Sequence, residues 1–311
     1  MDRVSWIDWA KVICIWLMVS CHSGQTGMIL NLTYQFHMPA FFIISGILFR
    51  PKGVKNTLVS FVVPILFFSL LTLLSKIFVW GGSWGALLKS YTFGYVAPAE
   101  TSPFQGYWFV AVLLMMRLVM ECRICRDCKM IIAIACVLYC LIEPCLPIPS
   151  DVFLWKPYHI ISCMPFFVVG IEIKERQIEI NNGSFEFMSL LFVVFFILTQ
   201  IQGRVDIAGY NYGVNYVLFY ANAILGSYLL FCLCMFLPTR IWIQTLSTGT
   251  FLVLGLHGMM YGYIMAIFRR LSMTNSYLPL LAGIVVMAIC YPLILFFKKY
   301  CPLILGKNHQ Y

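Results

Sequence analysis

The sequence predicts an all-α, polytopic integral membrane protein, and three observations carry that prediction. The 311-residue chain is 61% hydrophobic and only 11% charged, whereas about a quarter of the residues in a soluble domain are charged. Its mean hydropathy is +0.88. Its apolar residues gather in runs near the length, about 20 residues, that a helix needs to cross a bilayer. The net charge of +9 therefore indicates basic loops at a membrane surface rather than nucleic-acid binding.

Ten apolar segments are candidate membrane spans, and no soluble domain fits between them. We therefore interpret residues 1–311 as one transmembrane domain. Asp8 and Lys11 interrupt the first apolar run, so we expect it to remain as a span and not to be cleaved as a signal peptide. The ten segments lie near residues 6–23, 33–49, 57–78, 107–122, 130–147, 153–173, 185–202, 214–237, 245–265 and 277–297.

Lysine and arginine residues are distributed unevenly between the two membrane sides. With the N-terminus inside, thirteen of them fall in inner segments and five in outer segments. Cytoplasmic loops carry an excess of these residues. The bias predicts about ten spans with both termini in the cytoplasm, although the pair Arg269 and Arg270 then lies outside.

The first span carries polar residues that a plain membrane anchor does not need: Asp8, Lys11 and His22. In a helix, Lys11 and His22 lie within ~20° of the same face and ~16 Å apart along the axis. Ionisable residues inside a membrane are costly and mark functional sites. His22 is therefore the candidate catalytic residue, as a general base or a transient acyl carrier; the alternative is an interfacial polar residue.

Asp8 cannot orient the His22 ring, because the two residues are ~21 Å apart along a helix. We expect Asp8 to pair with Lys11 or a neighbouring helix. A carboxylate that orients His22 must come from another segment, and the candidates are Glu100, Glu143, Asp151 and Asp206.

The second span continues the polar track with His37 and Ser45. Pro39 fits the first turn of a helix, where its missing N–H costs nothing, so His37 is expected at the same membrane side as His22. The pair Ser45 and Gly46 suits either close helix packing or a gap that admits the chain of a ligand.

Two groups of cations are candidate binding residues for a phosphorylated ligand, because Arg and Lys bind phosphate. They also satisfy the positive-inside rule without any ligand. Trp108 and His257 are candidate residues on the acceptor side. No metal site is expected, because Cys122, Cys125 and Cys128 have no fourth ligand nearby. The two groups of cations are Arg50, Lys52 and Lys55, and Arg117, Arg123 and Arg126.

Together these motifs resemble the membrane-bound acyltransferase family 3. The matching pattern is Lys11, ten residues and His22, followed by Phe41-x-x-x-Ser45-Gly46. The segment FHMPAFFIISG, with Asp8-Trp9 upstream, is most similar to the branch that contains fucose O-acetylases and nodulation-factor acetyltransferases. Weaker matches are YWFVAVLL, MPFFVVGIEI and LGLHG.

The resemblance implies a multi-pass protein of a bacterial inner membrane that transfers an acetyl group from cytosolic acetyl-CoA, a co-substrate and not a bound cofactor. The implied acceptor is a sugar hydroxyl of an envelope or capsular polysaccharide, a lipid-linked glycan or another glycoconjugate. His22 matches the family's essential histidine, and Lys11 matches its basic partner. Many members carry Arg-x-x-Arg after the second span. This chain has Lys52-x-x-Lys55 there and Arg123-x-x-Arg126 later. The resemblance therefore does not decide which of these cations hold the CoA phosphates.

Two other classes of function fit the same residues. One is a transporter or flippase for glycan intermediates that moves protons through His22, His37 and His257. The other is an acyltransferase that uses another acyl-CoA or a lipid acceptor. Only an acyltransferase consumes acyl-CoA.

Overall fold

The structure is a computed structural model, and it describes residues 4–24, 26–78, 107–143, 158–180, 183–273 and 275–307. Within these ranges every regular element is a helix, and the only extended pairing is an isolated bridge between Asp206 and Asn211. The prediction of an all-α fold is confirmed for this part of the chain. The elements are α1 (Ser5–His22), α2 (Gly27–Ile47), α3 (Val54–Phe78), α5 (Trp108–Glu121), α6 (Arg123–Asp127), α7 (Lys129–Ile142), α8 (Tyr158–Glu175), α9 (Phe185–Gln202), η3 (Ile207–Gly209), α10 (Tyr216–Met235), α11 (Ile241–Thr248), α12 (Thr250–Arg270), α13 (Leu278–Tyr300) and η4 (Pro302–Leu305).

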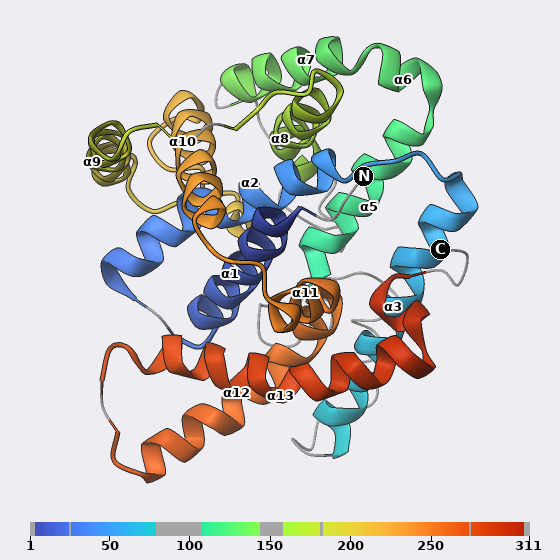
Figure 1. Cartoon of the computed structure of the whole chain (residues 1–311), viewed down its shortest axis with the longest axis vertical. Helices are drawn as coiled ribbons and strands as arrows, with labels where there is room; N and C mark the ends of the chain where they lie inside the picture. Colours follow the sequence, from blue (N-terminus) through green and yellow to red (C-terminus); the bar gives the residue numbers. More distant parts are fainter. Residues whose placement is uncertain are drawn as a thin grey trace.

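Helix α1 is the central element of the fold (Figure 1). It packs against α2, α10, α11, α12 and α13. Ala10, Cys14 and Val19 are completely buried. A helix that is apolar on most of its circumference is expected to be buried, and α1 is accordingly surrounded by five other helices.

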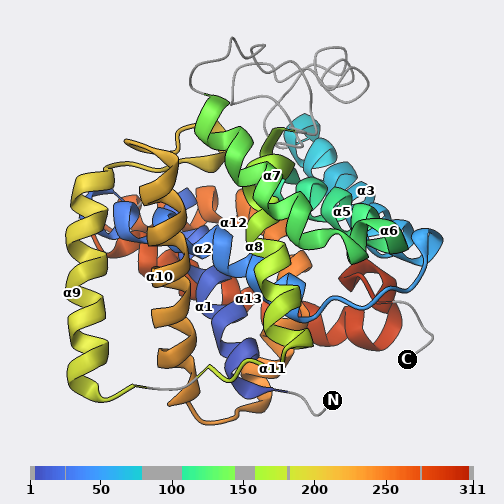
Figure 2. The same cartoon turned by 90° about the horizontal axis from the view of Figure 1, so that it is seen from above.

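The remaining helices surround α1 and α2. Helices α9 and α10 run side by side at one edge of the molecule, as both views show (Figures 1 and 2). Helix α8 packs extensively against α2 and also against α7. In α9, few side chains are buried, and its exposed surface is apolar, as expected for a helix that faces lipid.

Within the described residues, nine of the ten predicted segments each correspond to one helix, and the segment 245–265 corresponds to two. Among the described residues, five helices are long and apolar enough to cross a membrane by length and composition. The full count of ten spans and the placement of the termini stay predictions. The five helices are α3 (over Val54–Ser75), α9, α10, α12 and α13.

Two details of the sequence prediction were wrong. Helix α2 begins at Gly27, so Pro39 lies well inside it and not in its first turn. Membrane helices tolerate an internal proline because neighbouring groups satisfy the freed backbone atoms. The segment 245–265 is two helices, α11 and α12, separated at Gly249. A side chain at Gly249 would collide with Ile294 of α13, so the break lets α13 approach closely.

Helices α2 and α8 touch backbone to backbone where Gly46 meets Gly170. A Cβ atom added to Gly46 would collide with the Phe167 carbonyl oxygen and would lie 2.9 Å from the Gly170 Cα. Small residues permit such close approach of membrane helices. The packing interpretation of Gly46 is therefore the one that the structure supports.

We expect Gly46→Ala to destabilise the protein by about 1–3 kcal/mol, the usual cost of overpacking, because the added methyl group meets rigid backbone. Gly262→Ala is the matched control, since a Cβ at that helical position meets no atom within 4 Å. Thermal unfolding in detergent should show a lower melting temperature for Gly46→Ala only. Equal melting temperatures would contradict this account of the α2–α8 contact.

Candidate active site

One cavity of about 820 Å³ runs along α1 and α2. From Asp8 onward, its lining residues on α1 recur every three or four positions, which places them on one helical face. The same spacing holds on α2. Lys11 and His22 thus line one continuous space, with Ile15 and Met18 between them. The lining residues on and directly beside α1 and α2 are Val4, Trp6, Ile7, Asp8, Lys11, Ile15, Met18, His22, Tyr34, His37, Met38, Phe41, Ile44, Ser45, Ile47 and Leu48.

The end of the cavity near the start of α1 is rich in cations, and we call it the cationic end. It is lined by Arg50, Arg117, Lys174 and Lys307, with Lys11 further along α1. Lys11 Nζ donates to the Ser247 carbonyl oxygen at 2.6 Å. Lys174 Nζ donates to the Phe49 carbonyl oxygen. Several positive charges facing one space favour an anionic ligand.

Arg117 is the most strongly positioned of these cations. Its Nη2 donates to both the carbonyl oxygen and the Oγ atom of Ser45, each at 3.2 Å. Its guanidinium group lies 5.8 Å from the Phe49 ring centre and 5.7 Å from that of Phe61. Its Nε is buried without a hydrogen-bond partner. Buried polar atoms normally have a partner, so this donor is suited to a ligand oxygen.

Four of the six predicted cations do not line the cavity. Lys52 Nζ donates to Ser60 Oγ at 2.6 Å. Lys55 is exposed near the start of α3. Arg126 Nη1 donates to the last carbonyl groups of α5, and Arg123 is exposed beside Asp127. Only Arg50 and Arg117 of the predicted set reach the cavity.

Glu121 explains why Lys52 is held away from the cavity. Its carboxylate accepts hydrogen bonds from the backbone N–H groups of Lys52 and Gly53 and from Thr57 Oγ1. These bonds cap the start of α3, the role that a side-chain oxygen commonly plays at a helix N-terminus. The region after α2 is thus a structural turn.

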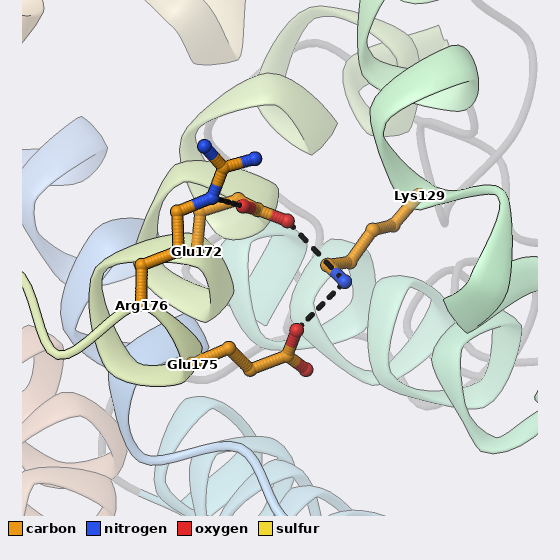
Figure 3. Close-up of polar contacts among 4 residues, drawn as sticks. All are labelled: Lys129, Glu172, Glu175 and Arg176. Carbon is orange, nitrogen blue, oxygen red and sulfur yellow. Dashed lines mark hydrogen bonds and ion pairs between the residues drawn. The ribbon is translucent and has the colours of Figure 1, made fainter.

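An ion network beside the cationic end joins α7 to α8 (Figure 3). Lys129 Nζ lies 3.2 Å from Glu172 and 2.7 Å from Glu175, and Arg176 pairs with Glu172. The two carboxylates are therefore engaged outside the cavity, whereas Lys174 of the same helical turn lines it. This arrangement keeps positive charge at the cationic end.

The opposite end of the cavity, which we call the histidine end, contains His22. Its Nδ1 lies 2.9 Å from the Nε2 of His257, and the two ring centres are 5.1 Å apart. The Nδ1 of His257 lies 2.7 Å from the Leu254 carbonyl oxygen. His257 is buried and does not line the cavity, so the structure places it behind His22.

Other groups at the histidine end surround His22 with donors, acceptors and aromatic rings. His37 lines the cavity, and its Nδ1 bonds to the Thr33 carbonyl oxygen at 2.8 Å. The Tyr34 ring centre lies 5.2 Å from that of His37. Trp108 and Asp206 also line this end. Aromatic faces beside hydrogen-bonding groups suit a ligand with both apolar and hydroxyl-bearing surfaces.

Of the two described carboxylates among the candidate partners of His22, Asp206 is placed near it and Glu143 is not. Asp206 lines the cavity and interacts electrostatically with His22. Glu143 accepts a hydrogen bond from Tyr216 and does not line the cavity. Glu100 and Asp151 lie outside the described residues.

Sequence reasoning did not single out Lys174, Lys307 and Tyr34 as site residues, although all three line the cavity. Tyr34 lies three residues before His37, so the helical period was a signal that could have found it. Lys174 is one of the thirteen lysine and arginine residues assigned to the inner segments, and its sequence position gives no further indication of a site. In the part of the chain that the structure describes, no cluster of His, Cys, Asp or Glu residues could hold a metal ion.

Comparison with known proteins identifies the family to which this chain belongs. A family model described as an acyltransferase domain, Acyl_transf_3, matches residues 4–297. The chain therefore belongs to the acyltransferase family 3. It is a membrane acyltransferase, which confirms the resemblance at the level of the family. No curated protein and no solved structure matches the chain.

Proposed function

We propose that this protein is an O-acetyltransferase of the bacterial inner membrane that moves an acetyl group from cytosolic acetyl-CoA to a sugar hydroxyl. The acceptor is an envelope or capsular polysaccharide, a lipid-linked glycan or a related glycoconjugate, as in the fucose O-acetylase and nodulation-factor branch. The observation that carries this proposal is the single cavity that joins four cations at one end to His22 at the other.

The cationic end holds the phosphates of the donor in this proposal. Arg117, with an unpartnered buried Nε, and Lys174 provide charge-assisted bonds, which are the stronger kind. The middle of the cavity is lined by Ile15, Met18 and Phe41. Apolar walls suit the uncharged arm of the donor. The thioester then reaches His22 while the phosphates stay outside the lipid.

At the histidine end, His22 Nε2 takes the proton of the acceptor hydroxyl as the hydroxyl oxygen attacks the thioester carbonyl carbon. A C–O bond forms, the C–S bond breaks, and the sulfur leaves with its electron pair and receives a proton from the imidazolium. In the carrier variant, His22 Nε2 attacks the thioester carbonyl carbon, so that a C–N bond forms, the C–S bond breaks and the CoA thiolate leaves. The acceptor oxygen then forms the C–O bond as the C–N bond breaks and returns its electron pair to Nε2, and the hydroxyl proton neutralises the thiolate. Trp108 and Asp206, which line the cavity, contact the acceptor in this proposal.

Membranes that contain the protein should transfer radiolabel from acetyl-CoA to the glycan fraction, and membranes without it should not. Parallel reactions with labelled succinyl-CoA, and extraction of the lipid fraction, test the other donor and acceptor. Label in none of these fractions, together with movement of a glycan intermediate across the membrane, would replace this proposal with a flippase. Enzymatic removal of the acetyl group at a defined sugar position would identify the product.

Exposed cysteines test the proposed orientation. Cys122 and Cys301 are exposed in segments that the charge bias places inside. A hydrogen bond from the Cys125 backbone N–H lowers the pKa of the Cys122 thiol, which favours reaction because the thiolate is the nucleophile. An impermeant maleimide should therefore label Cys122 and Cys301 in inverted vesicles but not in right-side-out vesicles. Mass spectrometry locates the label, and the buried Cys14 is the internal control. Labelling of Cys122 in right-side-out vesicles would reverse the orientation.

A further inference from the structure

The contact between His22 and His257 determines which nitrogen of His22 can react. The Leu254 carbonyl oxygen can only accept a hydrogen bond, so the His257 Nδ1 that faces it at 2.7 Å carries a hydrogen. A second proton on His257 would place a charge on a side chain that is only 5% exposed, which is costly without a counter-ion. His257 Nε2 is therefore an acceptor.

The tautomer of His22 follows from that of His257. Its Nδ1 lies 2.9 Å from the His257 Nε2, and a bond between two ring nitrogens needs one donor and one acceptor. His22 Nδ1 therefore carries the hydrogen. In a neutral imidazole the other nitrogen is then unprotonated, so the lone pair of His22 is on Nε2.

The backbone that starts this chain of bonds is itself fixed. A Cβ atom at Gly255 would collide with the ring of Phe68, which is almost completely buried. The Gly255 carbonyl oxygen also accepts a hydrogen bond from Tyr107 at 3.3 Å. Because this turn of α12 packs against two other elements, the Leu254 carbonyl group has a defined position relative to α1.

We infer that His257 is a positioning residue that holds His22 in the tautomer with Nδ1 protonated and Nε2 free to react. This inference rests on the proposed function, because it assigns the reacting atom of the same site. The partner of His22 is thus an imidazole anchored to a backbone carbonyl group, in place of a carboxylate. A histidine's reactive nitrogen is commonly set by the bond that its other nitrogen makes. His22 Nε2 is consequently the atom that takes the hydroxyl proton or the acetyl group.

Two substitutions at His257 separate this role from a structural one. His257→Gln retains an acceptor oxygen near the position of Nε2, whereas His257→Leu fills similar space without an acceptor. We expect His257→Leu to lower kcat about 10- to 100-fold, by analogy with the loss measured when the hydrogen-bond partner of a metal-binding histidine is removed. We expect His257→Gln to retain most of the wild-type kcat. The KM for acetyl-CoA should stay unchanged in both, because the cationic end is not altered. Ile264→Val, at a buried position on the same helix, is the control.

A spectroscopic measurement tests the tautomer without relying on activity. The full-length protein, labelled with ¹⁵N-histidine in lipid nanodiscs, should show His22 with Nδ1 protonated and Nε2 unprotonated; the His22→Gln spectrum assigns the signals. In His257→Leu this pattern should change, and in His257→Gln it should persist. A wild-type His22 with Nε2 protonated, or a His257→Leu protein with unaltered His22 signals and wild-type kcat, would overturn the inference. If His22→Gln were fully active, the proposed function would fail while the spectrum still reported the tautomer.

Discussion

A His22→Gln protein should lose about 10²- to 10⁴-fold in the rate of acetyl transfer and remain folded. General-base assistance by a positioned histidine typically contributes that much, and an amide group cannot take a proton from a hydroxyl or carry an acetyl group. His22 lines the cavity and is solvent-accessible, so its replacement leaves no buried cavity behind.

The measurement is labelled acetyl transfer at saturating acetyl-CoA, with melting temperature and elution volume as controls of folding. The KM for acetyl-CoA should not change, because the phosphates bind at the cationic end. Wild-type and His22→Gln membranes with equal transfer would remove the catalytic assignment. A covalent acetyl group found on wild-type His22 when acceptor is omitted would favour the carrier variant over the general-base variant.

Arg117→Met should raise the KM for acetyl-CoA about 10- to 100-fold with a much smaller change in kcat. Methionine approximates the length of the side chain but removes the guanidinium group. A hydrogen bond to a charged group contributes about 1.5–3 kcal/mol, and each 1.4 kcal/mol is about a tenfold change in affinity. The phosphates lose that bond in the variant, whereas the thioester and His22 are not altered.

Arg123→Met is the matched control for the same change in charge. The Arg123 side chain is 88% exposed and does not line the cavity, so its KM should equal that of the wild type. Arg117→Lys adds a second comparison, because an ammonium group cannot reproduce the forked donors of a guanidinium. Equal KM values for Arg117→Met and Arg123→Met would contradict the placement of the donor phosphates.

The first fifty residues could be predicted from the sequence to a useful degree. The spacing from Lys11 to His22 places both on one face of α1, and the structure has both on the wall of one cavity. Periodicity succeeds here because α1 is one unbroken helix. Within one helix, the face on which a residue lies depends only on its spacing from its neighbours in sequence. Helix α1 (Ser5–His22) also matches the predicted segment 6–23 closely, for the same reason.

Contacts between distant segments could not be predicted. His22 and His257 are 235 positions apart, and no local pattern encodes the approach of α12 to α1. The same limit applies to Arg117, which bonds to Ser45. Both residues were candidates from the sequence, but no sequence pattern indicated that they contact each other.

The cations were the least predictable part of the site. Lys52 and Lys55 follow α2 directly, as does Arg50, yet only Arg50 reaches the cavity. Gly53 adopts a left-handed conformation with a φ of 87°, and Glu121 caps the next helix. The chain turns there, so sequence proximity does not decide which charge faces the ligand. Pro39 was misplaced because an internal proline in α2 is tolerated by its neighbours.

The most direct test of the connected cavity is a sided transfer reaction. Proteoliposomes of uniform orientation would receive labelled acetyl-CoA only on the side of Arg50 and Lys307, and acceptor glycan only on the opposite side. Because CoA phosphates do not cross lipid, we expect labelled glycan in this arrangement and none when the donor is moved to the glycan side. Acetylation that requires donor and acceptor on the same side would contradict a cavity that carries the acetyl group from the cationic end to His22.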